Sequence, residues 1–450
     1  MLNKNNRMLV ESIKRLLRRG ATTHLRNIVN KTHAADLSIV FRSLPVPHQL
    51  QLLDMIRDTE KKGILFSELD EDTFASLSNA MELEDLVEVL EQMPTDDVAD
   101  LIGRLPDDKS DAILERMKKE GSEEIEGLLR YDDDTAGGIM VTDFIALPQE
   151  LTAGKAIEKI QTEYHDVEMP FYLYVVDEYG KLVGVISLRQ LVVVAPETPL
   201  KQFMTKDVFA VGTDVDQEEV ANLVERYDIL AVPVVDENHR LVGIVTVDDV
   251  IDIFRDEATE DILKMAGVGE EFVETQTVFR STKTRLPWLL ASCLGGVVAF
   301  FVIGHFEGTL NRFAYLAAFI PVIMGMGGNI GTQSSTIVVR GLATGRINVR
   351  DFWRVVSKEF LIGLILGVFY AVLIASVAQF HYTVLMLALT VGAAVVISMT
   401  VAALVGSGVP LLLARLNIDP AVATGPFVTT SIDIISVYCY FILATTLLGV

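Results

Sequence analysis

The spacing of hydrophobic positions changes along the chain, and in residues 1–131 it is typical of short helices. Apolar residues recur there at helical intervals, and short joints containing proline separate the stripes. Acidic residues follow Pro94 and Pro106 closely, as expected where proline begins a helix and acids occupy its first turn. The pattern predicts an all-helical domain whose short helices stack as a small superhelix.

An internal repeat lies within residues 132–262. Residues 175–191 align without gaps on residues 234–250 at an offset of 59, with seven identical residues among seventeen. Each copy predicts a strand, a turn, a second strand and a helix, and the apolar strand runs indicate burial on both faces. A duplicated βαββα unit resembles a tandem pair of CBS domains, which we place at 132–200 and 201–262.

Long apolar segments follow from about residue 285. Each can cross a hydrocarbon core of about 30 Å. The basic N-terminus has no long apolar stretch of the kind that a signal peptide carries. The five segments are roughly 286–304, 313–339, 359–379, 383–413 and 423–448.

The pattern as a whole predicts a multidomain membrane protein. We expect an N-terminal α-helical superhelix, an α/β tandem CBS pair, a connecting helix at 263–284, and an all-α transmembrane domain of five helices at 285–450. The protein is expected to be multi-pass in the cell (inner) membrane, with its N-terminal domains cytoplasmic and its C-terminus outside. The five bases of the 340–358 loop then fall inside, as the positive-inside rule requires.

Charge is divided unevenly between the two parts of the chain. Residues 281–450 carry a net charge of +4, which leaves −27 on residues 1–280 of a chain whose total is −23. Such acidity excludes nucleic acid as the expected partner and favours cations. The two cysteines, Cys293 and Cys439, lie far apart in apolar segments, which argues against a disulfide framework or a zinc site.

Asp433 is the candidate for the central chemical role. It lies well inside the last apolar segment, where a carboxylate costs several kcal/mol and should face a partner or a wet cavity. A neutralised acid hydrogen-bonded between helices is the alternative. One carboxylate per subunit, completed by waters and carbonyl oxygens, is what partly hydrated Mg²⁺ prefers.

Residues 324–336 place glycines, amides and hydroxyls inside an apolar segment. Small residues permit close helix contact; they also permit a broken helix whose backbone carbonyls line a cavity. Gly425 and Pro426 form a matching interruption in the last segment. Paired interruptions around one acid favour a pore.

The helix expected after the second repeat has a strongly acidic face. Asp248, Asp252, Asp256 and Glu260 recur every four residues, and like charges at that spacing repel. The face is either solvated surface or a cation sensor whose bound ions relieve the repulsion. Asp419, in a predicted cytoplasmic loop, could meet it. So could the helical-domain acids Asp96, Asp97 and Asp100. The core stripe of this helix is expected at Val247, Val250, Ile251, Phe254 and Ala258.

A weak nucleotide signal lies at the start of the same helix. Thr246 and Asp249 form the Thr-x-x-Asp pattern that holds a ribose in many CBS domains, while the first copy, Ser187 to Gln190, lacks the acid. Binding of ATP therefore stays open, and the alternative is that Thr246 and Asp249 only begin the helix.

Together these features resemble the MgtE family of magnesium channels over essentially the whole chain. The resemblance implies a homodimer in the lipid bilayer with its pore on the two-fold axis, and closure by cytosolic Mg²⁺ through the connecting helix. It makes Asp433 the ion-selecting acid with Thr429 nearby, and Asn329, Gln333 and Thr336 part of the pore helix. Thr332 and Gly425 stand where some relatives have Asn. The acids in the regions that hold regulatory Mg²⁺ are Asp214, Asp216, Asp248, Asp249, Asp252, Asp256, Glu257, Glu260 and Asp419.

The expected function is therefore a Mg²⁺ channel or transporter that is not an enzyme. A pathway for another divalent cation, such as Mn²⁺ or Co²⁺, is the main rival. A CBS-controlled anion pathway conflicts with Asp433 and with the lack of bases inside the spans. A membrane enzyme lacks a nucleophile–base set there.

Overall fold

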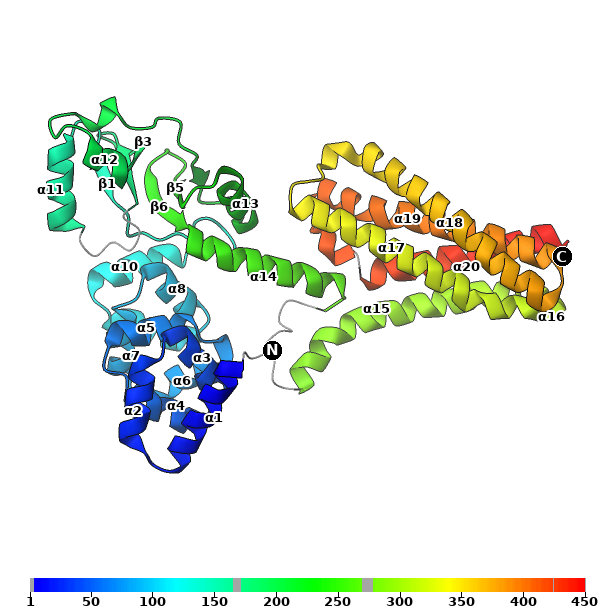
Figure 1. The fold of residues 1–450 in the computed structure, drawn as a ribbon, viewed down its shortest axis with the longest axis horizontal. Helices are drawn as coiled ribbons and strands as arrows, with labels where there is room; N and C mark the ends of the chain where they lie inside the picture. The colour runs from blue at the N-terminus through cyan, green and yellow to red at the C-terminus, as the bar shows by residue number, and fades with distance from the viewer. Residues whose placement is uncertain (1–3, 165–170, 269–277, 424, 450) are drawn as a thin grey trace. The chain divides into compact units, whose positions relative to one another are not determined.

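The computed structural model describes residues 4–164, 171–268, 278–423 and 425–449 (Figure 1). It divides into two compact units, Met1–Phe254 and Arg255–Val450. The helices of the N-terminal part are α1 (Lys4–Arg18), α2 (Thr22–Lys31), α3 (Ala34–Arg42), α4 (Val46–Leu53), α5 (Thr59–Ser67), α6 (Glu71–Ala80), α7 (Leu83–Leu90), α8 (Thr95–Gly103), α9 (Asp107–Arg116) and α10 (Lys119–Leu128).

These short helices stack as the pattern predicts. Pro45, Pro94 and Pro106 stand at the N-cap positions of α4, α8 and α9, where proline's fixed φ suits a helix start. Most helices pack against the second helix after them, as α3 does on α5, α5 on α7 and α8 on α10. A continuous apolar core runs through the stack, with Phe41 and Phe66 fully buried.

The CBS pair follows as two three-stranded sheets. Its elements are β1 (Ala146–Pro148), α11 (Ala153–Glu163), β2 (Tyr172–Val176), β3 (Leu182–Ser187), α12 (Leu188–Val193), η1 (Leu200–Gln202), β4 (Val211–Gly212), α13 (Gln217–Tyr227), β5 (Ala231–Val235), β6 (Leu241–Thr246) and α14 (Val247–Met265).

The two sheets repeat one another at the offset seen in the sequence. In each, the first strand is parallel to the second, and the second is antiparallel to the third. Tyr172 pairs with Ser187 as Ala231 pairs with Thr246, and each antiparallel pair carries an irregularity at its last residue. The hairpin turns of the copies bond to each other, with Leu182 N donating to His239 O at 3.2 Å. The duplication is confirmed.

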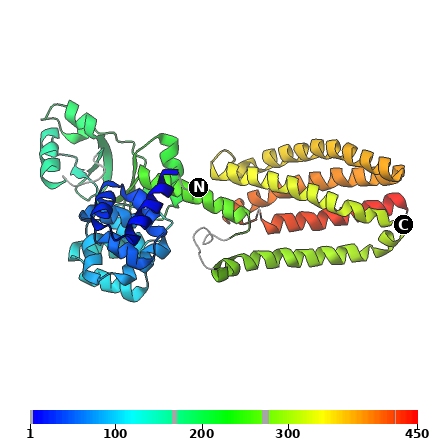
Figure 2. The same cartoon turned by 60° about the horizontal axis from the view of Figure 1, so that its bottom comes forward.

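The second unit contains the long apolar helices (Figure 2). Among the described residues, five spans are long and apolar enough to cross a membrane, as predicted. The elements are α15 (Val278–His305), α16 (Glu307–Arg312), η3 (Ala314–Phe319), α17 (Ile320–Ala343), η4 (Val349–Asp351), α18 (Phe352–Tyr382), α19 (Leu385–Arg415), η5 (Pro420–Ala423) and α20 (Pro426–Leu448).

Helix α19 is the centre of this unit, and it packs against α17, α18 and α20. In its most apolar window 61% of residues are buried, against 11% in α15. Glycines bring the helices close: a Cβ at Gly406 would lie 2.3 Å from Gly331 O of α17, and one at Gly363 would lie 3.0 Å from Met399 O. Small residues at contacts are how helices pack without a hydrophobic driving force between them.

The structure corrects or restricts four of the predictions. Helix α17 is continuous through residues 324–336, so the expected break is absent there; Gly425 is the N-cap of α20 and Pro426 its first residue, so they begin this helix rather than interrupt it. In α14, Ile251 is 64% exposed and Ile253 is buried, because the helix joins the core shared with the helical domain. Of the connecting helix predicted at 263–284, residues 269–277 lie outside the described residues.

Replacing Gly406 by Ala should destabilise the membrane unit by about 1–3 kcal/mol, because overpacking forces α17 and α19 apart. Thermal unfolding of the detergent-purified protein would measure the loss. Gly408→Ala is the matched control, since a Cβ there meets no atom within 4 Å. Equal stability of the two variants would contradict the close helix contact.

Candidate functional site

Two helix starts bring acidic residues together in the first unit. Asp96 and Asp97 lie in the first turn of α8, and Asp248 and Asp249 lie in the first turn of α14. Thr95 and Thr142 share a hydrogen bond of 2.8 Å beside them. The charges of Asp97 and Asp249 both act on Asp96, so the structure assembles a predicted pair of acidic regions that lie far apart in the sequence.

Burial makes this cluster electrostatically costly. It raises the pKa of Asp96 to about 8, and the neighbouring charges of Asp97 and Asp249 add to the shift. Burial likewise raises the pKa of Asp249 to about 6, against a lowering effect of its hydrogen bond from Thr246. Asp96 Oδ1 is buried and accepts no hydrogen bond from the described residues. A buried acceptor of this kind is satisfied well by a cation or its bound water.

Helices α12 and α14 occupy equivalent places in the two repeats, and each is capped at its start by a contact between residues three positions apart. Thr246 Oγ1 donates to Asp249 Oδ2 at 2.5 Å, and Ser187 with Gln190 forms a capping box. Thr246 is buried. These contacts account for Thr246 and Asp249 as helix-starting residues, and the nucleotide role remains a prediction.

The remaining predicted acids of the first unit are spread over its surface. Asp216 caps α13 by accepting from Glu218 N at 2.8 Å, and Asp214 is exposed in the same loop. Asp100 is the exception: although much of the residue is exposed, burial raises the pKa of its carboxyl, and its charge raises the pKa of Asp249, so it borders the α8–α14 cluster. Asp252 is exposed one turn beyond Asp248.

The far end of α14 forms a second charged group, within the second unit. Lys264 pairs with Glu260 one turn away, and its Nζ lies 2.8 Å from Asp419 Oδ2. Asp419 also accepts from Ala421 N at 2.8 Å, which fixes the loop before α20. Burial raises the pKa of Asp261, and the charge of Asp419 adds to the shift. Asp256 is exposed beside Arg255, and Glu257 is half-buried.

A close backbone contact lies next to this charged group. Gly267 has φ +71°, and a Cβ there would lie 2.7 Å from Pro426 Cδ. Gly425 is buried, and a Cβ on it would lie 3.1 Å from Gly267 N. The turn after α14 therefore packs directly on the first residues of α20, the helix that carries Asp433.

Asp433 lies about two turns into α20 and is half-buried. Its Oδ1 is 3.8 Å from the position that a Cβ on Gly328 of α17 would take. The carboxylate of Asp433 therefore lies close to the bare backbone of Gly328. Thr429, one turn earlier, donates back to Gly425 O and Pro426 O at 3.2 and 3.3 Å.

Helix α17 carries a polar stripe on one exposed face. Asn329, Thr332, Gln333 and Thr336 are all exposed, and at 100° per residue they fall on one side of the helix. The opposite side, with Gly327 and Gly331, packs against α19 and α20. Exposed amides and hydroxyls are poorly suited to lipid tails, so this stripe is suited to water or to another protein surface.

Direct metal ligation is limited in this arrangement. In the parts of the chain that the structure describes, no three His, Cys, Asp or Glu side chains lie close enough to hold an ion together. Mg²⁺ needs no such set, because it keeps several waters and uses one or two carboxylates. The acidic groups can therefore accept hydrated ions.

Sequence reasoning missed three residues of these groups. Lys264 and Asp261 were not predicted, although the i,i+4 spacing of Glu260 and Lys264 signals an ion pair. Glu359 is a second acid inside a span: it is buried and accepts from Ser334 Oγ at 2.7 Å. Glu359 lies at the first position of the predicted apolar segment, so the sequence did not single it out. Hydropathy alone does not show whether a side chain at the end of a helix is buried.

The spans, the CBS pair and the acidic helical domain define a multi-pass membrane transport protein with a large N-terminal part outside the spans. The MgtE divalent cation transporter family matches residues 320–443, the MgtE intracellular N domain matches 32–134, and the CBS domain matches 136–197 and 200–256. The chain belongs to the MgtE family. This confirms the resemblance, and because the family's members are named transporters, the protein is not an enzyme.

Relatives match along nearly the full length. The magnesium transporter MgtE of Bacillus subtilis is 34% identical, with 96% of this chain and 95% of that protein covered. The Thermus thermophilus magnesium transporter MgtE is 36% identical, with 98% of each covered. A crystal structure of the cytosolic domain of the Mg²⁺ channel MgtE in complex with ATP is 35% identical, with a TM-score of 0.52, and covers 54% of this chain and 99% of that one.

Binding of a divalent cation at the α8–α14 cluster should strengthen as pH rises from about 6 to about 8, because the ion displaces the proton that Asp96 holds. Without the ion, the raised pKa gives stability at low pH that is lost as pH rises through about 8. Mg²⁺-dependent protection of the full-length protein from proteolysis, titrated at several pH values, would measure this.

Asp96→Asn should remove most of that pH dependence. Asp107→Asn is the control, because Asp107 also lies in a helix first turn and is exposed. A wild-type protein whose Mg²⁺ response does not change across this pH range would argue against the cluster.

Proposed function

We propose that this protein is a Mg²⁺-selective channel of the plasma membrane that closes when cytosolic Mg²⁺ is high. The single observation that carries the proposal is the placement of Asp433. A half-buried carboxylate inside a span, next to the bare backbone of Gly328, is the kind of group that a permeating cation can neutralise.

A homodimer with its pore on the two-fold axis accounts for the polar stripe. Asn329, Gln333 and Thr336 face outward from a single chain, where lipid tails would leave their polar groups unsatisfied. Two copies related by a two-fold axis would bring both stripes and both Asp433 carboxylates to one water-filled path. Thr429, Gly425 and Pro426 then lie at the start of the helix that lines it.

The chemistry of the path favours Mg²⁺ among divalent cations. Two carboxylates with amide and hydroxyl oxygens suit a hard ion that keeps most of its waters, and the relatives are named magnesium transporters. Mn²⁺ or Co²⁺ is the alternative cargo. Adding Mn²⁺ or Co²⁺ during Mg²⁺ uptake separates the two possibilities. If one of these ions is the true cargo, it should block Mg²⁺ uptake at a far lower concentration than in a Mg²⁺-selective channel.

Closure follows from the acidic groups at both ends of α14. Like charges at the α8–α14 cluster favour separation, and bound Mg²⁺ would favour the compact arrangement. At the far end, α14 reaches Asp419 and the start of α20 through Lys264, Gly267 and Gly425. A shift of α14 is thereby passed to the helix that carries Asp433.

A nucleotide is a second regulatory ligand under this proposal. The similar crystal structure of an MgtE cytosolic domain is a complex with ATP. In this chain, Thr246 and Asp249 offer a hydroxyl and a carboxylate at the CBS pair. The N-terminal domains are then cytosolic and the C-terminus outside. Regulatory Mg²⁺ is held by acids among Asp96, Asp97, Asp100, Asp214, Asp216, Asp248, Asp249, Asp252, Asp256, Glu257, Glu260 and Asp419.

Asp433→Asn should reduce Mg²⁺ flux into proteoliposomes by about tenfold or more, because contacts to a charged group are worth about 1.5–3 kcal/mol. Glu307→Gln is the control, since it neutralises an exposed acid of α16 in the same unit. Normal flux through Asp433→Asn would place selectivity elsewhere.

A second variant, Asp248→Ala/Asp252→Ala/Asp256→Ala, should conduct at a Mg²⁺ concentration that closes the wild type. Removing three repelling charges also removes the groups that ions bridge. The control removes the same charge from exposed residues of the helical domain, as Glu71→Ala/Asp72→Ala/Asp85→Ala. If the first variant still closes at the wild-type concentration, its acidic face is only solvated surface.

A further inference from the structure

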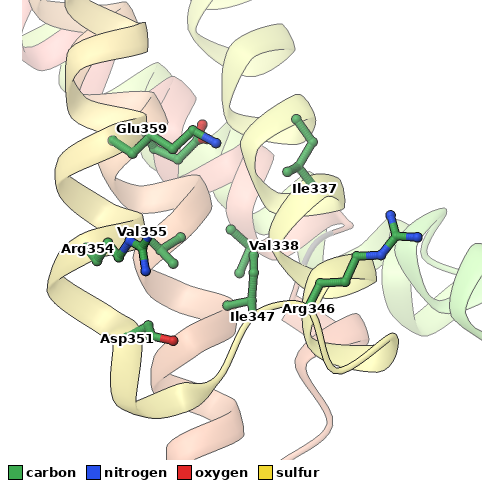
Figure 3. Close-up of a pocket in the computed structure, with 9 residues that line it drawn as sticks. Ile337, Val338, Arg346, Ile347, Asp351, Arg354, Val355 and Glu359 are labelled. Carbon is green, nitrogen blue, oxygen red and sulfur yellow. The ribbon is translucent and has the colours of Figure 1, made fainter. Parts of the chain in front are cut away.

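A pocket lies between α17 and α18 at the end of the membrane unit that carries the basic loop. Its volume is about 270 Å³, and Figure 3 shows labelled residues of α18 and of the loop around it. Asp351, Arg354, Val355, Lys358 and Glu359 line it at the spacing of one helix face. The other lining residues are Ile337, Val338, Arg346 and Ile347.

The loop that closes the pocket has a fixed backbone. Gly345 has φ +63°, and Ile347 N donates to Gly341 O at 2.8 Å. A Cβ on Gly341 would lie 2.4 Å from Ile347 Cδ1, so the isoleucine sits directly on the glycine. These contacts fix the backbone of Arg346 at the edge of the pocket, and its side chain extends outward from there (Figure 3).

The pocket's cations lack partners in the protein. Arg346, Arg354 and Lys358 are exposed, and within the described ranges none of them makes an ion pair or a side-chain hydrogen bond. Two acids share the pocket: Asp351 is exposed, whereas Glu359 is buried and bonded to Ser334. Three cations against two carboxylates leave an excess of positive charge, which suits an anion.

Apolar surface adjoins the pocket. Among its lining residues Ile337 is 59% exposed, while Trp353, which is 79% exposed, and Phe360 lie on the opposite side of α18. Trp at such a position is typical of the membrane–water interface. A ligand that satisfies both the cations and the adjoining apolar surface is an amphiphile with an anionic head. A free phosphate would satisfy the cations alone.

We propose that the pocket formed by Arg346, Arg354 and Lys358 between α17 and α18 binds the phosphate group of an anionic phospholipid. Basic pockets between transmembrane helices at the membrane surface are suited to such head groups. The acyl chains then follow Ile337 and the apolar surface next to it. The lipid joins α18 to α17, the helix of the polar stripe, and its binding does not depend on which ion the protein carries.

The test is the thermal stability and lipid binding of the full-length, delipidated protein in detergent. Phosphatidylglycerol should raise the unfolding midpoint, and phosphatidylcholine or inorganic phosphate should raise it much less. Arg346→Gln/Arg354→Gln/Lys358→Gln should weaken phosphatidylglycerol binding at least about tenfold, since each cation near an anionic lipid contributes about fivefold. Lys283→Gln/Arg312→Gln/Arg415→Gln removes equal charge from exposed residues elsewhere and should bind normally.

Each other outcome overturns the proposal. If phosphatidylcholine raises the unfolding midpoint as much as phosphatidylglycerol does, the pocket does not recognise the charge of the lipid. If inorganic phosphate does so, the pocket is a site for free anions. Equal weakening in the control variant reduces the effect to general surface charge. If the triple variant fails to fold, Arg354→Gln and Lys358→Gln are measured singly, and wild-type affinity in both contradicts the assignment.

Discussion

Burial of carboxylates at the first turns of α8 and α14, together with their mutual repulsion, is the constraint on which the first unit depends. Asp96 is half-buried with an unsatisfied oxygen, and the charges of Asp97 and Asp249 act on it. Helix N-termini favour anions, which allows the acids to gather there. The carboxylates nevertheless lie so close together that their repulsion destabilises the compact arrangement. That arrangement therefore depends on bound protons or bound cations.

In the second unit, close contacts connect the far end of α14 to the helix that carries Asp433. Lys264 ties the end of α14 to Asp419, and Gly267 lies against Pro426 at the start of α20. The first contact is an ion pair between side chains, whereas the second brings the backbone of Gly267 directly against the proline ring. About two turns further along α20 lies Asp433. The contact chain within this unit is continuous from the acidic helix to the acid in the span.

Local pattern predicted most of the fold and part of the site. The repeat was visible because β2 and β5, and β3 and β6, keep one offset, and the spans were visible because hydropathy depends on composition alone. Contacts between distant residues were not. Ile253 rather than Ile251 is buried because its side of α14 joins the apolar core of the first unit. Gly331 contacts Gly406, and Lys264 contacts Asp419, only in the folded protein. Residue spacing in the sequence likewise does not show that α17 stays helical through its glycines, which pack against α19 and α20.

Hydrogen exchange of the full-length protein, with and without millimolar Mg²⁺, tests most directly whether divalent cations close the acidic groups. We predict slower exchange in α8, in α14 and in the loop that contains Asp419, with little change in α1 to α4, which lie outside the acidic cluster. Exchange in α8 and α14 that is the same with and without Mg²⁺ would contradict the central claim that cation binding, rather than solvation, balances these charges.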